Sequence, residues 1–291
     1  MFSNKELRSM IITLFFEQLL VMLVGIVDTF VVSSCGEAAV SGVSLVNQFN
    51  TIFIYLFTAL ASGGAIVVSQ YIGNKDEKRT VLSSSQLLMF SIVFSIVLSI
   101  LVLIFNKQLL GLLFGKVESD VMKACVTYLR ISAYSYPALA IYNAGAALYR
   151  SMAKVTMYIS FAANIINVVG NIIGVYVLKA GVAGVAYPSL ISRVFSAIII
   201  TVLCFNKKLE AYYDLKDIFR FDGKMLKRIL NIAIPNGVEN GIFQLVKVAL
   251  SSIVAMFGTY QIAANGVAQS IWSLAALVGS AMGPVFITVI G

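Results

Sequence analysis

Six ionisable side chains fall inside long apolar runs of this sequence, where they could bind or relay an ion. A charge at the centre of a lipid bilayer costs about 2.5–3.5 kcal/mol, so six lipid-exposed charges would cost on the order of 15 kcal/mol or more. We therefore expect them to face a bundle interior or a water-filled cavity. Three acids and three bases could also pair and serve only to join helices. The six residues are Glu17, Asp28, Arg130, Arg193, Glu239 and Lys247.

Glu17 and Asp28 should point the same way from the first run. Their spacing of 11 residues brings them within about 20° of each other around a helix. A carboxylate in a partly desolvated cavity can bind a proton or a monovalent cation. A later run presents Asn164, Asn167 and Asn171 on one face, and these amides could either bind a cation or form interhelical hydrogen bonds worth about 0.6–2 kcal/mol each. We predict Asp28, Asn167, Asn171 and Glu17 as cation-coupling residues.

A second polar stripe follows near residue 240. Asn236, Asn240, Gln244, Lys247 and Ser251 are spaced by four, four, three and four residues, which places them along one side of a helix. A proline next to Asn236 allows a bend at which a gate could move. We predict that these residues, with one tyrosine and one glutamine from other runs, line a substrate cavity or take part in gating. The candidates are Pro235, Glu239, Asn240, Gln244, Lys247, Gln269 and Tyr136.

The elements that carry these residues are predicted to be transmembrane helices. Of the 291 residues, 59% are hydrophobic and only 12% are charged, whereas a soluble domain has about 25% charged residues. Apolar runs of about 20 residues match the ~30 Å thickness of a bilayer core, and their continuous character excludes a β-barrel. We predict an all-α, polytopic membrane protein with helices near residues 10–33, 42–72, 84–105, 121–148, 155–178, 182–205, 229–257 and 261–290.

Basic residues divide unequally between the two sides of these helices. Cytoplasmic loops of membrane proteins collect Lys and Arg, so the side with more of them is expected to face the cytoplasm. With the N-terminus inside, the inner segments hold Lys5, Arg8, Lys75, Lys78, Arg79, Arg150, Lys154, Lys207, Lys208, Lys216, Arg220, Lys224, Lys227 and Arg228. The outer segments hold only Lys107, Lys116, Lys123 and Lys179. The N-terminus is therefore predicted to be cytoplasmic, in the plasma membrane of a prokaryote.

Several classes of function are disfavoured by composition. The net charge of +8 would suggest nucleic acid as a partner of a soluble protein, but the inner loops of a membrane protein account for it. The chain has no histidine, which removes histidine-based metal sites and Ser-His triads. Its three cysteines are widely spaced, so no disulfide framework or metal motif follows. We expect no enzymatic activity, no cofactor and no nucleic-acid partner.

An internal repeat is visible at a shift of 222 residues. This shift aligns Glu17 with Glu239 and Gly36 with Gly258, so each acid lies 19 residues before the glycine that ends its helix. Repeats of the same orientation are common in transporters. We predict a six-helix lobe at residues 1–205, a cytoplasmic connector at 206–228, and the first two helices of an incomplete second lobe at 229–291. The connector could be amphipathic and lie on the membrane or could be a solvated linker.

Several motifs resemble those of the MATE (multidrug and toxic compound extrusion) family of cation-coupled antiporters. The first is Gly25-Ile26-Val27-Asp28-Thr29, which is similar to a Val-Asp-Thr signature of that family. The others occur in family order and together span the chain. They are the run from Gly63 to Gly73, Tyr128-Leu129-Arg130 with Pro137, the Arg150 turn, the run from Gly181 to Tyr187, and Ile262-Ala263-Ala264-Asn265-Gly266.

The resemblance implies a fold of twelve helices in two lobes, of which this chain holds about eight, and export of organic cations or drugs in exchange for H⁺ or Na⁺. Asp28 and Asn167 match the family's cation site, so Na⁺ could bind there without being a resident metal. Asn171 lies where many members have an aspartate, which leaves the coupling ion open. Glu239 lies near an acidic position of some members. The expected partners are membrane lipid and a small cationic substrate, and the expected state is a monomer.

One alternative is a flippase for a lipid-linked saccharide, built on a related two-lobe fold. Its cavity should be rich in arginine to hold pyrophosphate. The bases predicted within the membrane, Arg130, Arg193 and Lys247, do not cluster in the sequence. An intramembrane enzyme is a weaker alternative because no nucleophile and base can be assigned. A non-transporting membrane scaffold is a third alternative, and the six buried charges argue against it.

Overall fold

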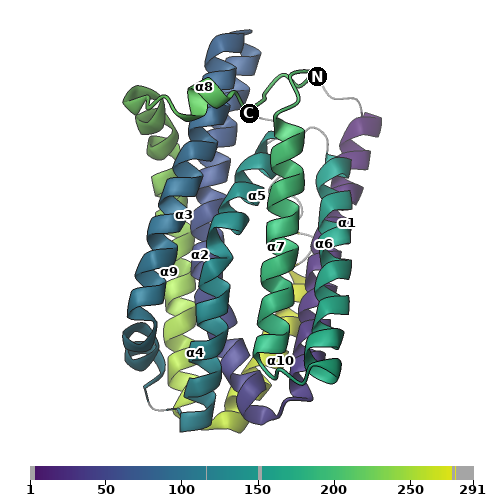
Figure 1. The fold of residues 1–291 in the computed structure, drawn as a ribbon, viewed down its shortest axis with the longest axis vertical. Coiled ribbons are helices and arrows are strands. Elements are labelled where there is room, and N and C mark those ends of the chain that lie inside the picture. The colour runs from purple at the N-terminus through teal and green to yellow at the C-terminus, as the bar shows by residue number, and fades with distance from the viewer. Residues whose placement is uncertain (1–3, 116, 150–152, 277–278, 280–291) are drawn as a thin grey trace.

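The computed structural model describes residues 4–115, 117–149, 153–276 and 279. The described residues form helices and no strand, in the order α1 (Asn4–Ser33), α2 (Glu37–Gly73), α3 (Glu77–Phe114), α4 (Ser119–Tyr134), α5 (Tyr136–Leu148), α6 (Ala153–Ile172), the π-helical turn η2 (Ile173–Val177), α7 (Ala183–Cys204), α8 (Leu215–Ile218), α9 (Gly223–Ala255) and α10 (Thr259–Ala275). Apart from the short α8, the helices run roughly side by side, with the turns gathered at two ends (Figure 1). The predicted all-α membrane architecture is confirmed.

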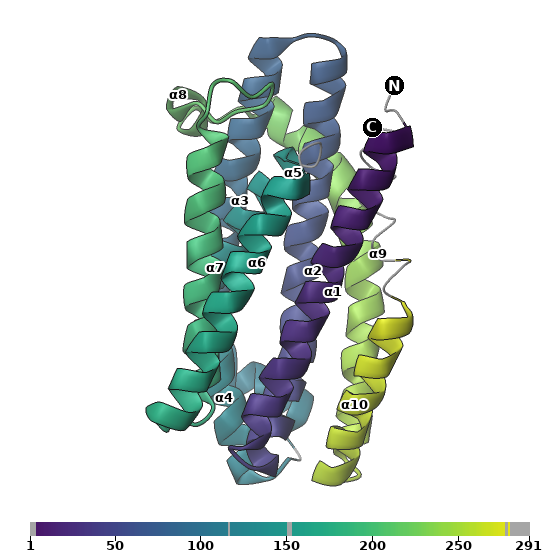
Figure 2. The same ribbon diagram turned by 90° about the vertical axis from the view of Figure 1, so that its right-hand side faces the viewer.

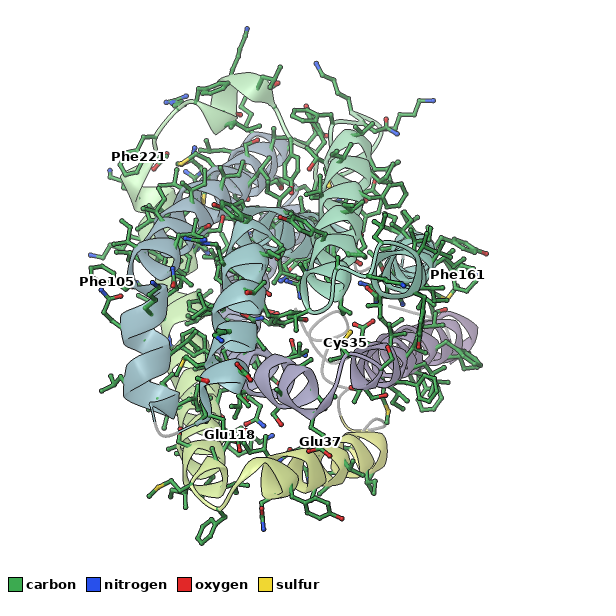
Figure 3. All side chains as sticks on the ribbon, turned by 60° about the horizontal axis from the view of Figure 1, so that its bottom comes forward. Cys35, Glu37, Phe105, Glu118, Phe161 and Phe221 are labelled. Atoms are coloured by element: carbon green, nitrogen blue, oxygen red, sulfur yellow. The ribbon has the colours of Figure 1, made fainter. Side chains whose placement is uncertain are left out.

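Five helices in the described part of the chain are long and apolar enough to cross a membrane. They are α2, α3, α6 with η2, α7 and α9. Large apolar side chains cover their outer surfaces, and Figure 3 shows Phe105 and Phe161 at the rim of the bundle. Both are about half exposed, at 47% and 49%. Lipid chains can cover such surfaces, because only a hydrocarbon solvent makes their exposure favourable.

One predicted helix is broken. The sequence pattern predicts a continuous helix at 121–148, but α4 ends at Tyr134 and α5 begins at Tyr136. Pro137 explains the break, because proline has no N–H and its ring clashes with the carbonyl four residues earlier. Ser135 occupies the junction, and its hydroxyl donates to the carbonyl of Ser132 over 2.6 Å. Proline is accommodated within the first turn of α5.

Glycines form the turns that pair α1 with α2 and α9 with α10. Gly36 has φ of 99° and Gly258 has φ of 113°, values that favour glycine because a side chain would be strained there. Each glycine donates its N–H back to the end of the preceding helix, to Ser33 and to Ala255 respectively. The two hairpins therefore repeat one turn geometry, in agreement with the shift of 222 residues seen in the sequence.

The packing places α2 at the centre of the bundle. It contacts α3, α4, α5 and α9, and Figure 2 shows α1 running beside α6 and α2. The largest buried cluster includes Phe53, Phe57 and Tyr136, whose rings pack edge to face or stack. Small residues of α2 allow close approach to its neighbours. A side chain at Gly63, for example, would collide with Ala233 of α9.

The connector at 206–222 is attached to α3 by one buried amide. Gln86 donates to the carbonyls of Asp217 and Arg220, and its Oε1 accepts from the N–H of Asp222 over 3.1 Å. Nearby, the Ser85 hydroxyl accepts from the N–H of Asp214 over 3.0 Å. These bonds hold the connector and the short α8 beside α3, near its N-terminal end, as Figure 1 shows. The connector is therefore a docked segment along this stretch.

Replacing Gln86 with leucine should release the connector. Three backbone groups would lose their partner, which should destabilise this region by about 1–3 kcal/mol. We expect trypsin to cleave the connector of Gln86→Leu several-fold faster, after Lys216 or Arg220, as measured by limited proteolysis in membranes. Gln108→Leu, an exposed position on the same helix, is the matched control and should behave like the wild type. Equal cleavage rates of the two variants would contradict the role of Gln86.

Candidate functional site

A polar cavity of about 280 Å³ lies between α1, α5, α6 and α7. Asp28 comes from α1, Asn164 and Asn167 come from α6, and Arg193 comes from α7. Hydroxyl-bearing residues, apolar residues and one glycine complete the lining. These are Val24, Gly25, Leu139, Tyr142, Ser160, Ala163, Ser189, Ser192 and Ser196.

The amide of Asn171 joins the acid of α1 to the asparagines of α6. Its Nδ2 donates both to Oδ1 of Asp28 and, over 3.2 Å, to Oδ1 of Asn167. The amide of Asn167 in turn donates to the hydroxyl of Ser189 on α7 over 2.9 Å. A continuous chain of hydrogen bonds therefore crosses three helices. The structure brings together three of the four residues that the sequence predicted for cation coupling.

The hydrogen-bonded chain contains oxygen atoms that can accept a cation. Within the described residues, Oδ1 of Asn171 is buried and has no hydrogen-bond partner. Buried polar atoms without a partner are uncommon and point to an unmet ligand. Oδ1 of Asp28 and Oδ1 of Asn167 both accept from Nδ2 of Asn171, and hard cations such as Na⁺ prefer carboxylate and amide oxygens. The donor set therefore fits a monovalent cation or a proton on Asp28.

Arg193 is the cavity residue to which sequence reasoning assigned no role. Its Nη1 donates to the hydroxyl of Ser135 over 2.6 Å, and its charge interacts electrostatically with that of Asp28. Among the described lining residues these two carry the formal charges, so the cavity is balanced without a bound ion. The sequence feature that marks Arg193 is an arginine inside an apolar run, but residue spacing alone does not show which residues it faces.

The remaining residue predicted for coupling, Glu17, has a side chain that lies outside the described part of the structure. Tyr136 was predicted to line a cavity, but it is only 1% exposed and donates its hydroxyl to Oδ1 of Asn50 over 2.7 Å. The tyrosine that lines the cavity is Tyr142, whose hydroxyl is 2.9 Å from that of Ser160. Tyr136 therefore belongs to the aromatic core beside α2.

The candidate residues of α9 and α10 do not reach this cavity. Pro235 lies inside an uninterrupted α9 and, like Glu239 and Gln269, is exposed. Asn240 is half-buried and donates to Oδ1 of Asn236 over 2.8 Å, one turn earlier on the same helix. None of these residues is among those that line the cavity containing Asp28.

Lys247 and Ser251, two residues of the polar stripe on α9, contact neighbouring helices. Gln244 of this stripe is buried. The ammonium of Lys247 lies 4.9 Å from the ring centre of Phe243 and 4.4 Å from that of Trp272 on α10. Cation–π contacts of this kind stabilise a charge away from water. One turn later, Ser251 donates to Oε1 of Gln48 on α2. Lys247 therefore links α9 to α10, whereas Ser251 links α9 to α2.

The charges within the membrane do not pair with one another in the described part of the structure. The ion pairs found there join Arg79 to Asp76 and Lys123 to Asp120, all near helix ends. Arg130 on α4 is exposed, as is Glu239 on α9. The expectation that all six charges face an interior therefore holds for Asp28 and Arg193, which share a cavity.

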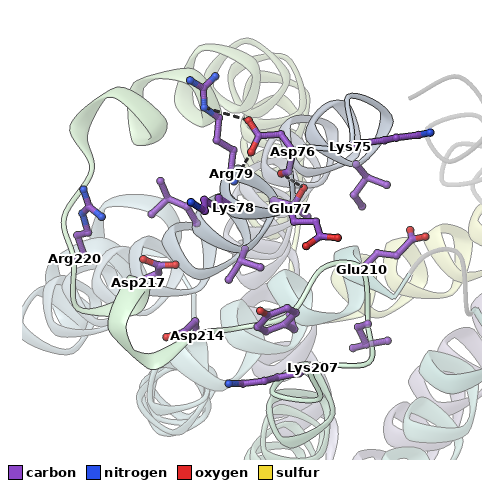
Figure 4. A pocket seen from close by; sticks show the side chains of 16 residues that line it. Lys75, Asp76, Glu77, Lys78, Arg79, Lys207, Glu210, Asp214, Asp217 and Arg220 are labelled. Atoms are coloured by element: carbon purple, nitrogen blue, oxygen red, sulfur yellow. Dashed lines mark hydrogen bonds and ion pairs between the residues drawn. The ribbon is translucent and has the colours of Figure 1, made fainter.

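A larger pocket of about 770 Å³ lies at the polar end, between the α2–α3 turn and the connector. Figure 4 shows Lys75, Lys78, Arg79, Lys207 and Arg220 around it, facing Asp76, Glu77, Glu210, Asp214 and Asp217. Five positive and five negative charges balance on this hydrophilic surface. No residue predicted for coupling or gating lies here. Among the described residues, no group of three or more His, Cys, Asp or Glu side chains could hold a metal ion.

Two glycines allow η2, the continuation of α6, and α7 to approach closely beside the cavity. A side chain on Gly184 would lie 2.6 Å from the carbonyl carbon of Gly174, and one on Gly174 would collide with the carbonyl of Gly184. The helical backbones therefore touch at this point. The contact lies one to two turns from Asn167 and Ser189, whose hydrogen bond depends on the same spacing. Close packing of glycines thus positions the site.

Comparison with known proteins gives one consistent family. The MatE family model matches residues 13–173, which is more than half of the chain. Uncharacterized transporter YisQ of Bacillus subtilis (strain 168) is 26% identical over 274 residues, covering 92% of this chain and 60% of YisQ. Probable multidrug resistance protein YoeA of the same organism is 26% identical over 245 residues, covering 80% of this chain and 52% of YoeA. The chain spans about half to three fifths of the length of these relatives.

The fold agrees with the same family. A solved structure described as the outward-facing conformation of a multidrug resistance MATE family transporter of the MOP superfamily superposes with a TM-score of 0.86 at 21% identity. The match covers 97% of this chain and 62% of that structure. The helical arrangement found here is therefore that of the MATE fold.

The glycine contact between η2 and α7 can be tested by adding one methyl group. Gly184→Ala should force the two helices apart and destabilise the protein by about 1–3 kcal/mol, because overpacking a close backbone contact costs that much. Thermal unfolding in detergent would show this as a lower midpoint. Gly111→Ala, where open space surrounds a helical glycine, should be neutral or stabilising because alanine favours helix. Equal midpoints for the two variants would contradict the close contact.

Proposed function

We propose that this chain, which belongs to the MATE family of membrane transporters, is part of a secondary transporter that exports organic cations in exchange for H⁺ or Na⁺. The chain spans less than two thirds of its relatives, so the transport activity is proposed for the complete gene product. One observation carries the proposal. Asp28, Asn167 and Asn171 meet in a single hydrogen-bonded chain beside a polar cavity.

Ion binding at Asp28 is the proposed coupling step. The Asp28 carboxylate accepts a hydrogen bond from Asn171, which also donates to Asn167. A cation or proton on Asp28 would compete with this hydrogen bond and change how α1 is attached to α6 and α7. A ligand shifts a conformational equilibrium only if it binds one state better than the other. We infer that the ion favours one arrangement of α1 against α6.

The driving force is sufficient for useful export. One monovalent cation entering the cell across about 150 mV releases roughly 3.5 kcal/mol. Since about 1.4 kcal/mol corresponds to a tenfold change in an equilibrium constant, this could maintain a substrate gradient of a few hundred. We propose that the end of the bundle containing the α2–α3 turn and the connector faces the cytoplasm, because the basic residues of the sequence gather there.

The flippase alternative is less well supported. A site for a pyrophosphate would need several arginines, whereas Arg193 is the arginine among the described residues that line the cavity. Arg130 is exposed on α4 and does not join it. The comparisons also favour the multidrug transporter relatives. We therefore retain cation-coupled export as the proposed function.

A contact between α2 and α9 is proposed to close the cytoplasmic side. Arg228 of α9 donates to the hydroxyl of Tyr71 over 2.8 Å and to Oε1 of Gln70 over 2.9 Å. Its guanidinium also lies 4.9 Å from the centre of the Tyr71 ring. These contacts join the last turn of α2 to the first turns of α9, the helix that follows the connector. Opening toward the cytoplasm would have to separate them.

The role of Asp28 can be tested in vesicles that contain the complete gene product. We expect efflux of a cationic dye under an H⁺ or a Na⁺ gradient, and we expect Asp28→Asn to reduce gradient-driven efflux at least tenfold because the amide cannot take up a proton or supply a negative charge. Asp120→Asn, an exposed acid near the start of α4, is the matched control. Undiminished efflux in Asp28→Asn would rule out its proposed role.

The contact at Arg228 makes a separate prediction about conformation. Arg228→Met should lose interactions worth on the order of 2 kcal/mol and shift the population toward a state open to the cytoplasm. A reporter cysteine at Ser69, in a Cys35→Ser background, should then react about tenfold faster with a maleimide. Lys227→Met changes the adjacent exposed residue and should leave the labelling rate unchanged. The proposed closure fails if both methionine variants label at the wild-type rate.

A further inference from the structure

The cavity contains two opposite charges that do not form an ion pair. Asp28 and Arg193 both line it and interact electrostatically, yet no ion pair within 4.0 Å joins them in the described structure. The carboxylate of Asp28 accepts from Asn171 instead. A guanidinium and a carboxylate in one small polar cavity would ordinarily form a bidentate pair. Something therefore holds Arg193 away from Asp28.

The restraint on Arg193 is the break between α4 and α5. Ser135 stands at this break, and its hydroxyl accepts from Nη1 of Arg193 over 2.6 Å. Ser135 is only 1% exposed, so the contact is shielded from water. The guanidinium is thus retained at a fixed place across the cavity from the acid.

We propose that Arg193 is a built-in competitor of the coupling cation, a fixed positive charge that lowers the affinity of the Asp28 site for Na⁺. This inference rests on the proposed function, because it assigns the regulation of the same site. With Arg193 in place the cavity has no net formal charge, so adding Na⁺ leaves it positive. The site therefore releases the ion readily, and the distance of Arg193 from Asp28 determines how readily.

The size of the effect follows from Coulomb's law. At an effective dielectric constant of about 20, unit charges several ångströms apart change a binding constant by about tenfold or more. The neighbouring lining residues cannot replace this effect, because they are hydroxyls, amides or apolar groups. Arg193 is therefore the residue whose removal should change Na⁺ binding.

The test measures binding of radioactive Na⁺ to the purified complete gene product, with choline chloride keeping ionic strength constant. Arg193→Gln should bind Na⁺ at least tenfold more tightly than the wild type. Arg193→Lys keeps the positive charge and should stay within about threefold of the wild-type affinity. Unchanged affinity in Arg193→Gln, or equal tightening in Arg193→Lys, would overturn the proposal. Circular dichroism would show that each variant is folded.

A second variant should change the Na⁺ affinity in the opposite direction. Ser135→Ala removes the restraint, so Arg193 can move toward Asp28 and should weaken Na⁺ binding at least threefold. A loss of packing alone would not make Arg193→Gln and Ser135→Ala differ in sign. Tighter or unchanged Na⁺ binding in Ser135→Ala would contradict the proposed tether.

The same measurement in an Asp28→Asn background separates this inference from the proposed function. Arg193→Gln should then change Na⁺ affinity by less than about twofold, because the carboxylate on which Arg193 acts is gone. A tenfold change that persists would show that Arg193 acts elsewhere. If Asp28→Asn abolishes efflux while Arg193→Gln leaves Na⁺ binding unchanged, the competitor role fails and the proposed function stands. If Asp28→Asn leaves efflux intact, the proposed function fails.

Discussion

A polar group inside a lipid bilayer has no water to bind, so it must find its partner within the protein. The backbone meets this requirement by forming helices. The side chains meet it through a few convergent contacts, of which the amide of Asn171 is the most consequential because it serves both Asp28 and Asn167. The position of α1 against α6 depends on that amide, and the proposed ion site lies where the same oxygens converge.

The described part of the structure contains few ion pairs and few buried charges, so each buried charge is informative. Asp28 and Arg193 share a cavity, but each is bonded to a neutral partner, Asn171 in one case and Ser135 in the other. Such an arrangement keeps both charges available. A closed ion pair between them would have satisfied both groups and left little reason for an ion to bind.

Two contacts restrain the part of the chain that joins α7 to α9. Gln86 holds the connector against α3, and Arg228 holds the first turns of α9 against Tyr71 of α2. Both lie at the end where the charged loops gather. The α9 helix then continues along α2 as far as Ser251 and Gln48. Any movement of α9 relative to α2 must exchange these polar contacts for others, so they determine which arrangements have low free energy.

The sequence by itself determined the class of protein and most of the helices, and it nominated Asp28, Asn167 and Asn171 as candidate coupling residues. Apolar runs of bilayer length permit little besides helices, and spacings of three and four residues place side chains on one face. The break at Ser135 could have been read from Pro137 but was not. Helix periodicity relates residues only within one helix, so it could not show that Tyr136 faces the aromatic core.

Only the tertiary structure decided which helices meet and therefore which charges share a cavity. Arg193 and Ser135 are 58 residues apart, and Gln86 is 131 residues from Asp217. No periodic pattern connects such positions. The meeting of η2 and α7 at Gly174 and Gly184 likewise depends on two backbones touching, which composition does not encode. The sequence thus identified Asp28 as a candidate ion site, and the packing of α7 against α5 and α6 placed an arginine opposite it.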